Sequence, residues 1–126
     1  MIGYTTVGTN DLNKAVAFYD ALFAGLGAGR FMENETFVAW AVAPDQPAFS
    51  VTLPYDGNAA TVGNGTMIAL AVDATEKVDA LYAKAMSLGA TDEGLPGERM
   101  AGFYAAYFRD LDGNKLNVFC MQAPEG

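Results

Sequence analysis

The sequence predicts an α+β fold of two tandem βαββ units, whose curved mixed sheets enclose a cleft. Three observations lead to this prediction. The order strand, helix, two strands occurs twice along the chain. The two expected helices end alike, at Leu26-Gly27-Ala28 and, 62 residues later, at Leu88-Gly89-Ala90. Trp40 and Tyr107, which are 67 residues apart, occupy matching places in the late hairpin of each half. An internal duplication accounts for all three observations.

The length and composition favour a single compact domain. The chain has 126 residues, and 52% of them are hydrophobic, which is enough for a core that needs no disulfides. We expect one domain over residues 1–126, with a first unit at 1–55, a connector of small residues at 56–65 and a second unit at 66–126.

The first unit is expected to begin with a strand over residues 2–8, where side chains alternate and several are β-branched. Thr9-Asn10-Asp11 then offers side-chain oxygens that cap a helix, and Gly27 supplies its stop. Residues 30–42 and 49–53 are rich in strand-forming side chains, and a proline-containing turn separates them. The apolar residues of the helix recur at spacings of three and four: Leu12, Val16, Tyr19, Phe23 and Leu26.

The second unit repeats this order from residue 66. Asp73-Ala74-Thr75-Glu76 resembles a capping box at the start of a helix that Gly89 ends. The hairpin at residues 103–120 turns at Asp110-Leu111-Asp112-Gly113-Asn114, and its last strand alternates. We place a five-residue insertion relative to the first unit in an expected loop at residues 94–102. One helical face is expected to carry Val78, Leu81, Tyr82, Ala85 and Leu88, and one face of the last strand Leu116, Val118 and Cys120.

Charge and residue types exclude several functional classes. The chain has 15 acidic and 7 basic residues and a net charge of −8, which argues against nucleic acid as a partner because phosphates require a basic surface. There is no histidine, so the commonest metal ligand and general base is missing. With one cysteine, no leader pattern and no long apolar run, we expect a cytoplasmic protein without a membrane-spanning segment.

Three segments carry a resemblance to a known family: Gly8-Thr9-Asn10-Asp11-Leu12, Phe18-Tyr19 and Phe108-Arg109-Asp110-Leu111-Asp112-Gly113-Asn114. With the duplicated unit, they resemble the vicinal oxygen chelate superfamily, which includes glyoxalase I, extradiol dioxygenases and bleomycin resistance proteins. The resemblance covers essentially the whole chain. It implies two βαββ units around a cleft, and chains that commonly pair as homodimers, in some cases with exchanged halves.

The resemblance also implies where a metal would bind. Enzymes of the family hold a divalent ion with one residue from the first strand and one from the last strand of each unit, usually histidine or glutamate. Those positions correspond here to Tyr4, Ser50, Met67 and Asn117. None of the four brings a negative charge or an imidazole, so we expect no metal and no other cofactor.

Without a metal, the side chains expected to face the cleft suggest a ligand site. We expect an apolar pocket with a few polar tips that holds a small organic ligand, cationic or aromatic, because the chain is acidic. The expected lining residues are Tyr4, Trp40, Ser50, Met67, Tyr107 and Asn117. The alternative is that these side chains simply fill a closed cleft, as aromatic and methionine residues do in ordinary cores.

Three further residues have side chains that are capable of catalysis or of binding a charged ligand. Glu98, in the expected loop over the cleft, is the best carboxylate candidate for acid–base catalysis, but as a charged loop residue it is expected first to be solvated. Arg109 is expected to pair with Asp110 or Asp112 in the turn; the alternative is that it reaches an anionic ligand at the mouth of the cleft. Cys120 is expected to be buried and inert, since no histidine can deprotonate it.

Three functions therefore remain open. The first is a metal-independent small-molecule binding protein. The second is a glyoxalase- or dioxygenase-type enzyme that uses metal ligands we do not recognise, so that catalysis itself stays undecided. The third is a non-catalytic interaction domain with a filled cleft. For each of them we expect a homodimer, and the connector at 56–65 is long enough for the halves to exchange.

Overall fold

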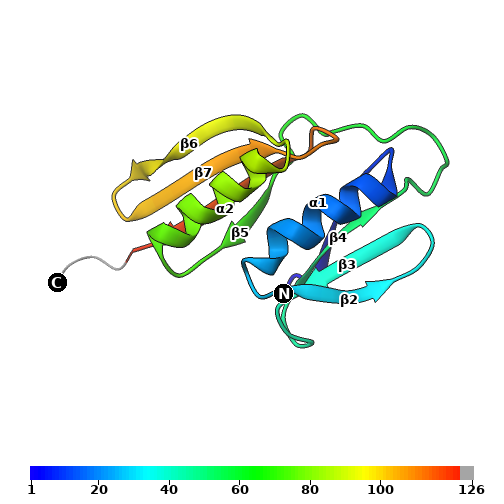
Figure 1. Ribbon diagram of the computed structural model, residues 1–126, viewed down its shortest axis with the longest axis horizontal. Helices are drawn as coiled ribbons and strands as arrows, with labels where there is room; N and C mark the ends of the chain where they lie inside the picture. Colours follow the sequence, from blue (N-terminus) through cyan, green and yellow to red (C-terminus); the bar gives the residue numbers. More distant parts are fainter. Residues whose placement is uncertain (123–126) are drawn as a thin grey trace. The chain divides into compact units, whose positions relative to one another are not determined.

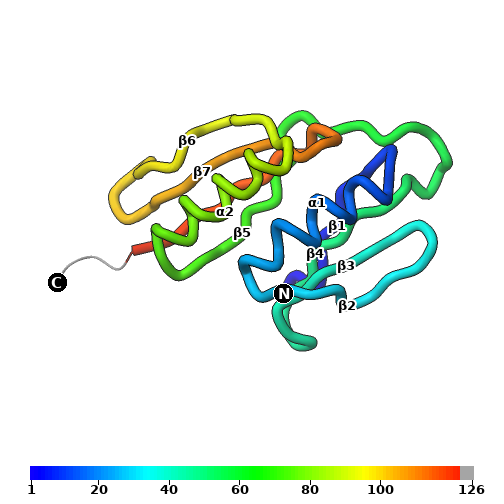
Figure 2. Tube along the Cα trace, viewed as in Figure 1, coloured from blue at the N-terminus to red at the C-terminus, as the bar shows by residue number. Residues whose placement is uncertain are grey.

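The protein is described from a computed structural model, which describes residues 1–122. The chain divides into two compact units, Met1–Asn64 and Gly65–Gly126, and each contains one helix and a four-stranded mixed sheet (Figure 1). The predicted α+β class, with two similar units in tandem, is confirmed. The trace in Figure 2 follows the chain from the first unit to the second through a segment without helix or strand, which includes residues 56–65.

The first unit has the strand order β1-β4-β3-β2. Strand β1 runs parallel to β4, whereas β3 is antiparallel to both β4 and β2. The helix α1 covers one face of this sheet (Figure 1). The elements are β1 (Tyr4–Gly8), α1 (Leu12–Ala24), β2 (Gly29–Glu33), β3 (Phe37–Ala41) and β4 (Ala48–Thr52).

The second unit repeats this topology, with the order β5-β8-β7-β6 and the same parallel pair, β5 with β8. Its helix, α2, packs on one face of the sheet, against β7 and β8 among others. The elements are β5 (Ile68–Ala71), α2 (Thr75–Ser87), β6 (Thr91–Met100), β7 (Phe103–Arg109) and β8 (Lys115–Met121). Among the residues that the structure describes, no helix is long and apolar enough to cross a membrane.

Each unit has one strand more than the sequence pattern predicts. Residues 30–42, read as one strand, form most of β2 and all of β3, and the chain reverses where Asn34 Oδ1 accepts a hydrogen bond from the Thr36 amide (2.9 Å). Residues 94–102, read as a loop, lie mostly in β6. The predicted loop is therefore wrong. Strand β6 accommodates its glycines and proline through three shifts of register against β7.

An aromatic cluster forms the core of the first unit. The Tyr19 ring lies 4.8 Å from Phe49 and 5.6 Å from Trp40, measured between ring centroids, and Phe23 lies 5.2 Å from Phe49. Such tilted and edge-on contacts stabilise a core beyond simple burial. The predicted helical face is rotated, however. Leu12, Val16 and Leu26 are only partly buried, and the residues of α1 that enter the core are Ala15, Phe18, Tyr19, Leu22 and Phe23.

The caps of the two helices differ. The Asp11 side chain accepts a hydrogen bond from the Lys14 amide (3.1 Å), which confirms the predicted N-terminal cap of α1. The capping box predicted for α2 is wrong, because Ala74 is the N-cap and no side chain caps it. Asp73 instead forms an ion pair with Lys77, one turn along the helix (2.6 Å).

The predicted hairpin in the second unit is confirmed in detail. The Asp110 Oδ1 atom accepts hydrogen bonds from the amides of Asp112 and Asn114, both at 2.9 Å, and Gly113 takes a positive φ of 91°. Its last strand alternates as expected. The residues on the side of α2 are fully buried: Leu116, Val118 and Cys120.

Candidate functional site

Each sheet has one face covered by its helix, and the residues expected to bind a ligand lie mainly on the opposite face. In β4, Phe49 contacts Tyr19 of α1, so its neighbour Ser50 points to the opposite face. In β8, the same alternation places Lys115, Asn117 and Phe119 on the face opposite α2. Each of these sheet faces is a candidate site, considered one unit at a time.

On the first sheet, Ser50 is fully buried and its hydrogen bonds are internal. Its hydroxyl donates to the carbonyl oxygen of Thr5 (2.6 Å), and the Thr6 hydroxyl lies 2.9 Å from the Ser50 Oγ atom. Because the single hydroxyl hydrogen of Ser50 is engaged with Thr5, Thr6 is the donor in this second bond. Tyr4 pairs with Ala48 at the start of β1, and its side chain is 66% exposed.

On the second sheet, Tyr107 and Asn117 are brought together. They lie directly opposite each other in the ladder of β7 and β8, which places their side chains on one face. Asn117 is 2% exposed, and its Nδ2 atom donates to the carbonyl oxygens of Ala106 (3.0 Å) and Val118 (3.3 Å). Both donor hydrogens of this carboxamide are thereby engaged, which leaves the Oδ1 atom as its remaining polar group.

The Tyr107 ring contacts two cations. The Arg99 Cζ atom and the Lys115 Nζ atom each lie 5.5 Å from the ring centroid. Glycines make room for this arrangement, since a Cβ atom at Gly94 would lie 3.0 Å from the Tyr107 ring and one at Gly97 would lie 3.0 Å from the Arg99 guanidinium.

A third cation, Arg109, lies beside Lys115 in the register of β7 and β8. Its guanidinium pairs with Glu93 and donates to the carbonyl oxygen of Gly113 (2.9 Å). The structure therefore shows Arg109 in an ion pair, as one of the two alternatives predicted. Its carboxylate partner, Glu93, lies on β6 rather than in the turn.

Trp40 is separated from the other expected site residues. It lies on the face of the first sheet that α1 covers, it is 2% exposed, and its ring packs 5.6 Å from Tyr19 and 5.7 Å from Phe23. Its indole Nε1 atom donates to the Asp20 carboxylate (2.8 Å). Trp40 is therefore a core residue, on the opposite side of the sheet from Ser50.

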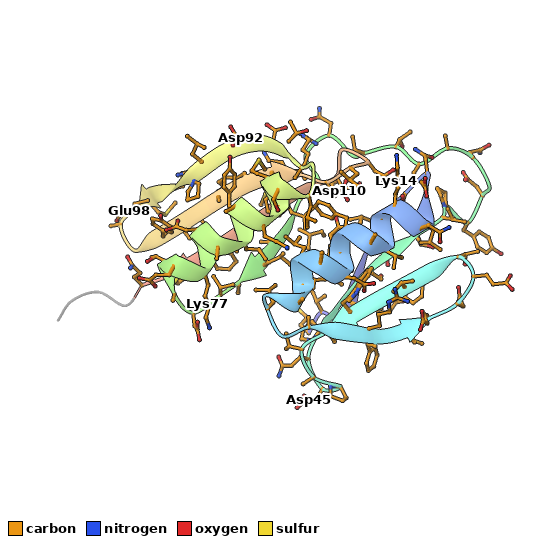
Figure 3. The ribbon with its side chains drawn as sticks, viewed as in Figure 1. Lys14, Asp45, Lys77, Asp92, Glu98 and Asp110 are labelled. Atoms are coloured by element: carbon orange, nitrogen blue, oxygen red, sulfur yellow. The ribbon has the colours of Figure 1, made fainter. Side chains whose placement is uncertain are left out.

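Glu98 is also placed differently from the expected site. Glu98 pairs with Tyr104 in the ladder, and the Tyr104 hydroxyl donates to Asp79 of α2 (2.6 Å), so this position belongs to the helix-covered face. Figure 3 shows Glu98 at the end of β6, where its carboxylate accepts a hydrogen bond from the Gly102 amide (3.2 Å). Met67 lies just before β5 and is 40% exposed.

A groove of about 420 Å³ lies between α1 and the β2–β3 hairpin of the first unit. An ion-pair network crosses it, in which Arg30 donates to Asp20 (2.6 Å) and to Glu33 (2.8 Å). The hydrogen bond from Arg30, supported by one from Trp40, lowers the pKa of Asp20 below its ordinary value. Arg30 and its two carboxylate partners therefore satisfy one another.

Comparison with known proteins identifies the family. The model of the Glyoxalase/Bleomycin resistance protein/Dioxygenase superfamily matches residues 1–118. The chain belongs to this superfamily. A glyoxalase/bleomycin resistance protein from Albidiferax ferrireducens is 37% identical, with a TM-score of 0.87 over 95% of this chain and 98% of that one. A search of curated proteins finds no match.

Two more distant solved structures are similar in fold. A hypothetical protein from S. aureus is 26% identical, with a TM-score of 0.74 over 95% of this chain and 92% of that chain. A lactoylglutathione lyase from Agrobacterium tumefaciens is 21% identical, with a TM-score of 0.72 over 94% and 92% of the two chains. At that identity the likeness to the lyase concerns the fold alone.

The residues expected at the superfamily's metal-ligand positions do not fit a divalent metal. Tyr4, Ser50, Met67 and Asn117 supply a phenol, a hydroxyl, a thioether and an amide, none of which is charged at neutral pH. The hydroxyl of Ser50 and the amide nitrogen of Asn117 are also engaged in their own sheets. Among residues 1–122, no three His, Cys, Asp or Glu side chains form a group that could hold a metal ion.

The contacts of Arg99 and Lys115 with Tyr107 are the part of the site that the sequence pattern misses. Lys115 precedes Asn117 by two residues, so its face was predictable from alternation. The position of Arg99 was not, because it depends on the register shifts that make residues 91–100 a strand.

Proposed function

We propose that this superfamily member binds a small organic molecule without a metal, on the sheet face opposite the helix. One observation carries the proposal. The two buried residues at the ligand positions of the last strands, Ser50 and Asn117, are uncharged and use their hydrogen-bond donors within their own sheets. Such residues shape a face but are poor partners for a hard or borderline cation, which prefers carboxylates and imidazoles.

The second sheet offers the features of an organic ligand site. The Phe103 and Phe119 rings lie 5.4 Å apart and, by the ladder register, on the same face as Tyr107 and Asn117. Aromatic surface with a few convergent polar atoms is typical of small-molecule sites. The Tyr107 hydroxyl and the Asn117 Oδ1 atom supply those polar atoms.

Thermal shift with a panel of small aromatic compounds, each with and without EDTA, tests the proposal. We expect at least one compound to raise the melting temperature equally in both conditions, because ligand binding to the native state stabilises it. Tyr107→Ala should abolish the shift. Tyr55→Ala is the matched control, since Tyr55 is fully exposed and remote from β7 and β8 in the sequence.

Metal analysis provides the opposing outcome. Stoichiometric, tight binding of Zn²⁺, Ni²⁺ or Mn²⁺ in equilibrium dialysis would overturn the proposal and favour a glyoxalase- or dioxygenase-type enzyme with ligands outside the four aligned positions. A panel without any response, together with no metal binding, would favour an interaction domain whose faces are filled.

A further inference from the structure

We infer that the ligand of the second sheet is a small molecule with a planar apolar body and one anionic group, which Arg99 and Lys115 bind beside the Tyr107 ring; this inference rests on the proposed function. The net charge of the chain points to a cationic ligand. The charges on this particular face point to an anion.

The first step is the charge state of the face. By ladder register and alternation, Arg99, Arg109 and Lys115 all lie on the face opposite α2. Only Arg109 has a carboxylate partner there, Glu93. Among the ion pairs of residues 1–122, neither Arg99 nor Lys115 takes part, so the face carries two uncompensated positive charges.

The second step is the proximity of these two charges. Both lie 5.5 Å from the same ring centroid, so they are at most about 11 Å apart. Salt screens most of the repulsion between exposed charges at the upper end of this range. The gain from an anionic ligand is therefore the charge-assisted hydrogen bonds that the two cations donate to it.

The third step is that Arg99 is held in place. Its guanidinium lies against Gly94 and Gly97, where an added Cβ atom would lie 3.1 and 3.0 Å from it, and it donates to the carbonyl oxygen of Leu95. Positioning the cation before the ligand arrives reduces the entropy lost on binding. The glycines of β6 thus leave the space that the Arg99 guanidinium occupies.

The rest of the face defines the remainder of the ligand. The aromatic rings of Tyr107, Phe103 and Phe119 suit a planar apolar body. The Asn117 Oδ1 atom is an acceptor next to Tyr107, so it favours a ligand with a hydroxyl or N–H group. An aromatic carboxylate with one such donor matches these features.

The test uses three probes of nearly equal shape and different charge: benzoate, benzamide and benzamidine. Binding is measured by chemical-shift changes of the backbone amides of β7 and β8 in the full chain. We expect benzoate to bind most tightly and benzamidine most weakly, and the benzoate affinity to fall as the NaCl concentration is raised from 50 to 500 mM. Inorganic phosphate is included to separate recognition of a bare anion from recognition of the ring.

Variants then test whether Arg99 and Lys115 are the cations that bind the anionic group. Arg99→Gln combined with Lys115→Gln should weaken benzoate binding about tenfold or more and abolish its salt dependence. Arg99→Lys should retain most of the affinity, which separates the loss of charge from a loss of folding. Lys84→Gln, on α2 and therefore on the other side of the sheet, is the control for the loss of a positive charge elsewhere and should leave binding unchanged.

The outcomes separate the inference from the proposed function. Tighter binding of benzamide or benzamidine at the same amides would refute the anionic ligand while the small-molecule site stands. Phosphate binding as tight as that of benzoate would refute the planar apolar body. An equal effect of the double variant and Lys84→Gln would refute the role of Arg99 and Lys115. No response to any of these probes would refute the inference, whereas the proposed function is refuted only when the wider panel of aromatic compounds also gives no response.

Discussion

Replacement of Asn117 by aspartate tests whether this position is structural. The substitution Asn117→Asp hardly changes the shape of the side chain, but it exchanges the NH₂ group for an oxygen. That oxygen would face the carbonyl oxygens of Ala106 and Val118, which now accept hydrogen bonds of 3.0 and 3.3 Å. A side chain that is 2% exposed has no water to replace them.

The expected cost follows from these contacts. Each lost hydrogen bond is worth about 1 kcal/mol, and the longer one is worth less. A buried carboxylate oxygen that faces two carbonyl oxygens adds about 1 to 3 kcal/mol. We therefore expect Asn117→Asp to lower the free energy of unfolding by about 3 kcal/mol at pH 7. The deficit should shrink at pH 4, because a buried carboxyl group binds a proton more tightly in the folded than in the unfolded chain.

Urea denaturation followed by circular dichroism measures this difference at both pH values. Asn13→Asp is the matched control, since Asn13 is exposed and the same change there should alter the free energy of unfolding by no more than about 0.5 kcal/mol. A loss below about 1 kcal/mol for Asn117→Asp at pH 7 would refute the reasoning, because it would mean that the carboxamide does not hold the sheet in place.

Three other predictions concern the Asp20–Arg30 ion pair, the positive φ of Gly89 and the oligomeric state. Asp20→Asn removes the ion pair with Arg30. This ion pair lowers the pKa of Asp20 in the folded protein. The stabilisation from the ion pair is therefore present above about pH 4 and is lost as the pH falls through the lower folded-state pKa. The variant should lose less than about 1 kcal/mol at pH 7, since the Asp20 side chain is 39% exposed, and its melting temperature should fall less steeply between pH 5 and 2; identical pH profiles would contradict this. Gly89→Ala should lower the free energy of unfolding by about 1 to 2 kcal/mol, because Gly89 has a φ of +100° and its added Cβ would lie 3.2 Å from Leu111. Gly3→Ala is the control and should leave the free energy of unfolding unchanged. Equal melting temperatures for the two variants would argue against backbone strain at Gly89. Light scattering should give twice the chain mass, as expected for a homodimer, and a monomeric mass would refute the dimer.

Much of the fold could be predicted from local chemistry. The turn at Asp110 and the cap at Asp11 were recognisable because their side chains bond to amides only two to four residues away. Alternation in β8 was readable because its apolar residues Leu116, Val118 and Cys120 recur at every second position and share one buried face. Residues 94–102 were misread, since glycine and proline are typical of loops and nothing local shows that β7 pairs with this segment.

The sequence by itself determined the superfamily, the duplicated units and the absence of histidine, because these properties depend on residue identity and on spacing along the chain. Only the tertiary structure decided that Trp40 bonds to Asp20 beneath α1, and that Arg99 and Lys115 meet at Tyr107. Those contacts join segments whose relative positions are set by strand register and by the rotation of a helix about its axis. A shift of one residue in strand register moves a side chain to the other face of the sheet, and a rotation of the helix turns a side chain toward the sheet or away from it. No local pattern records either choice.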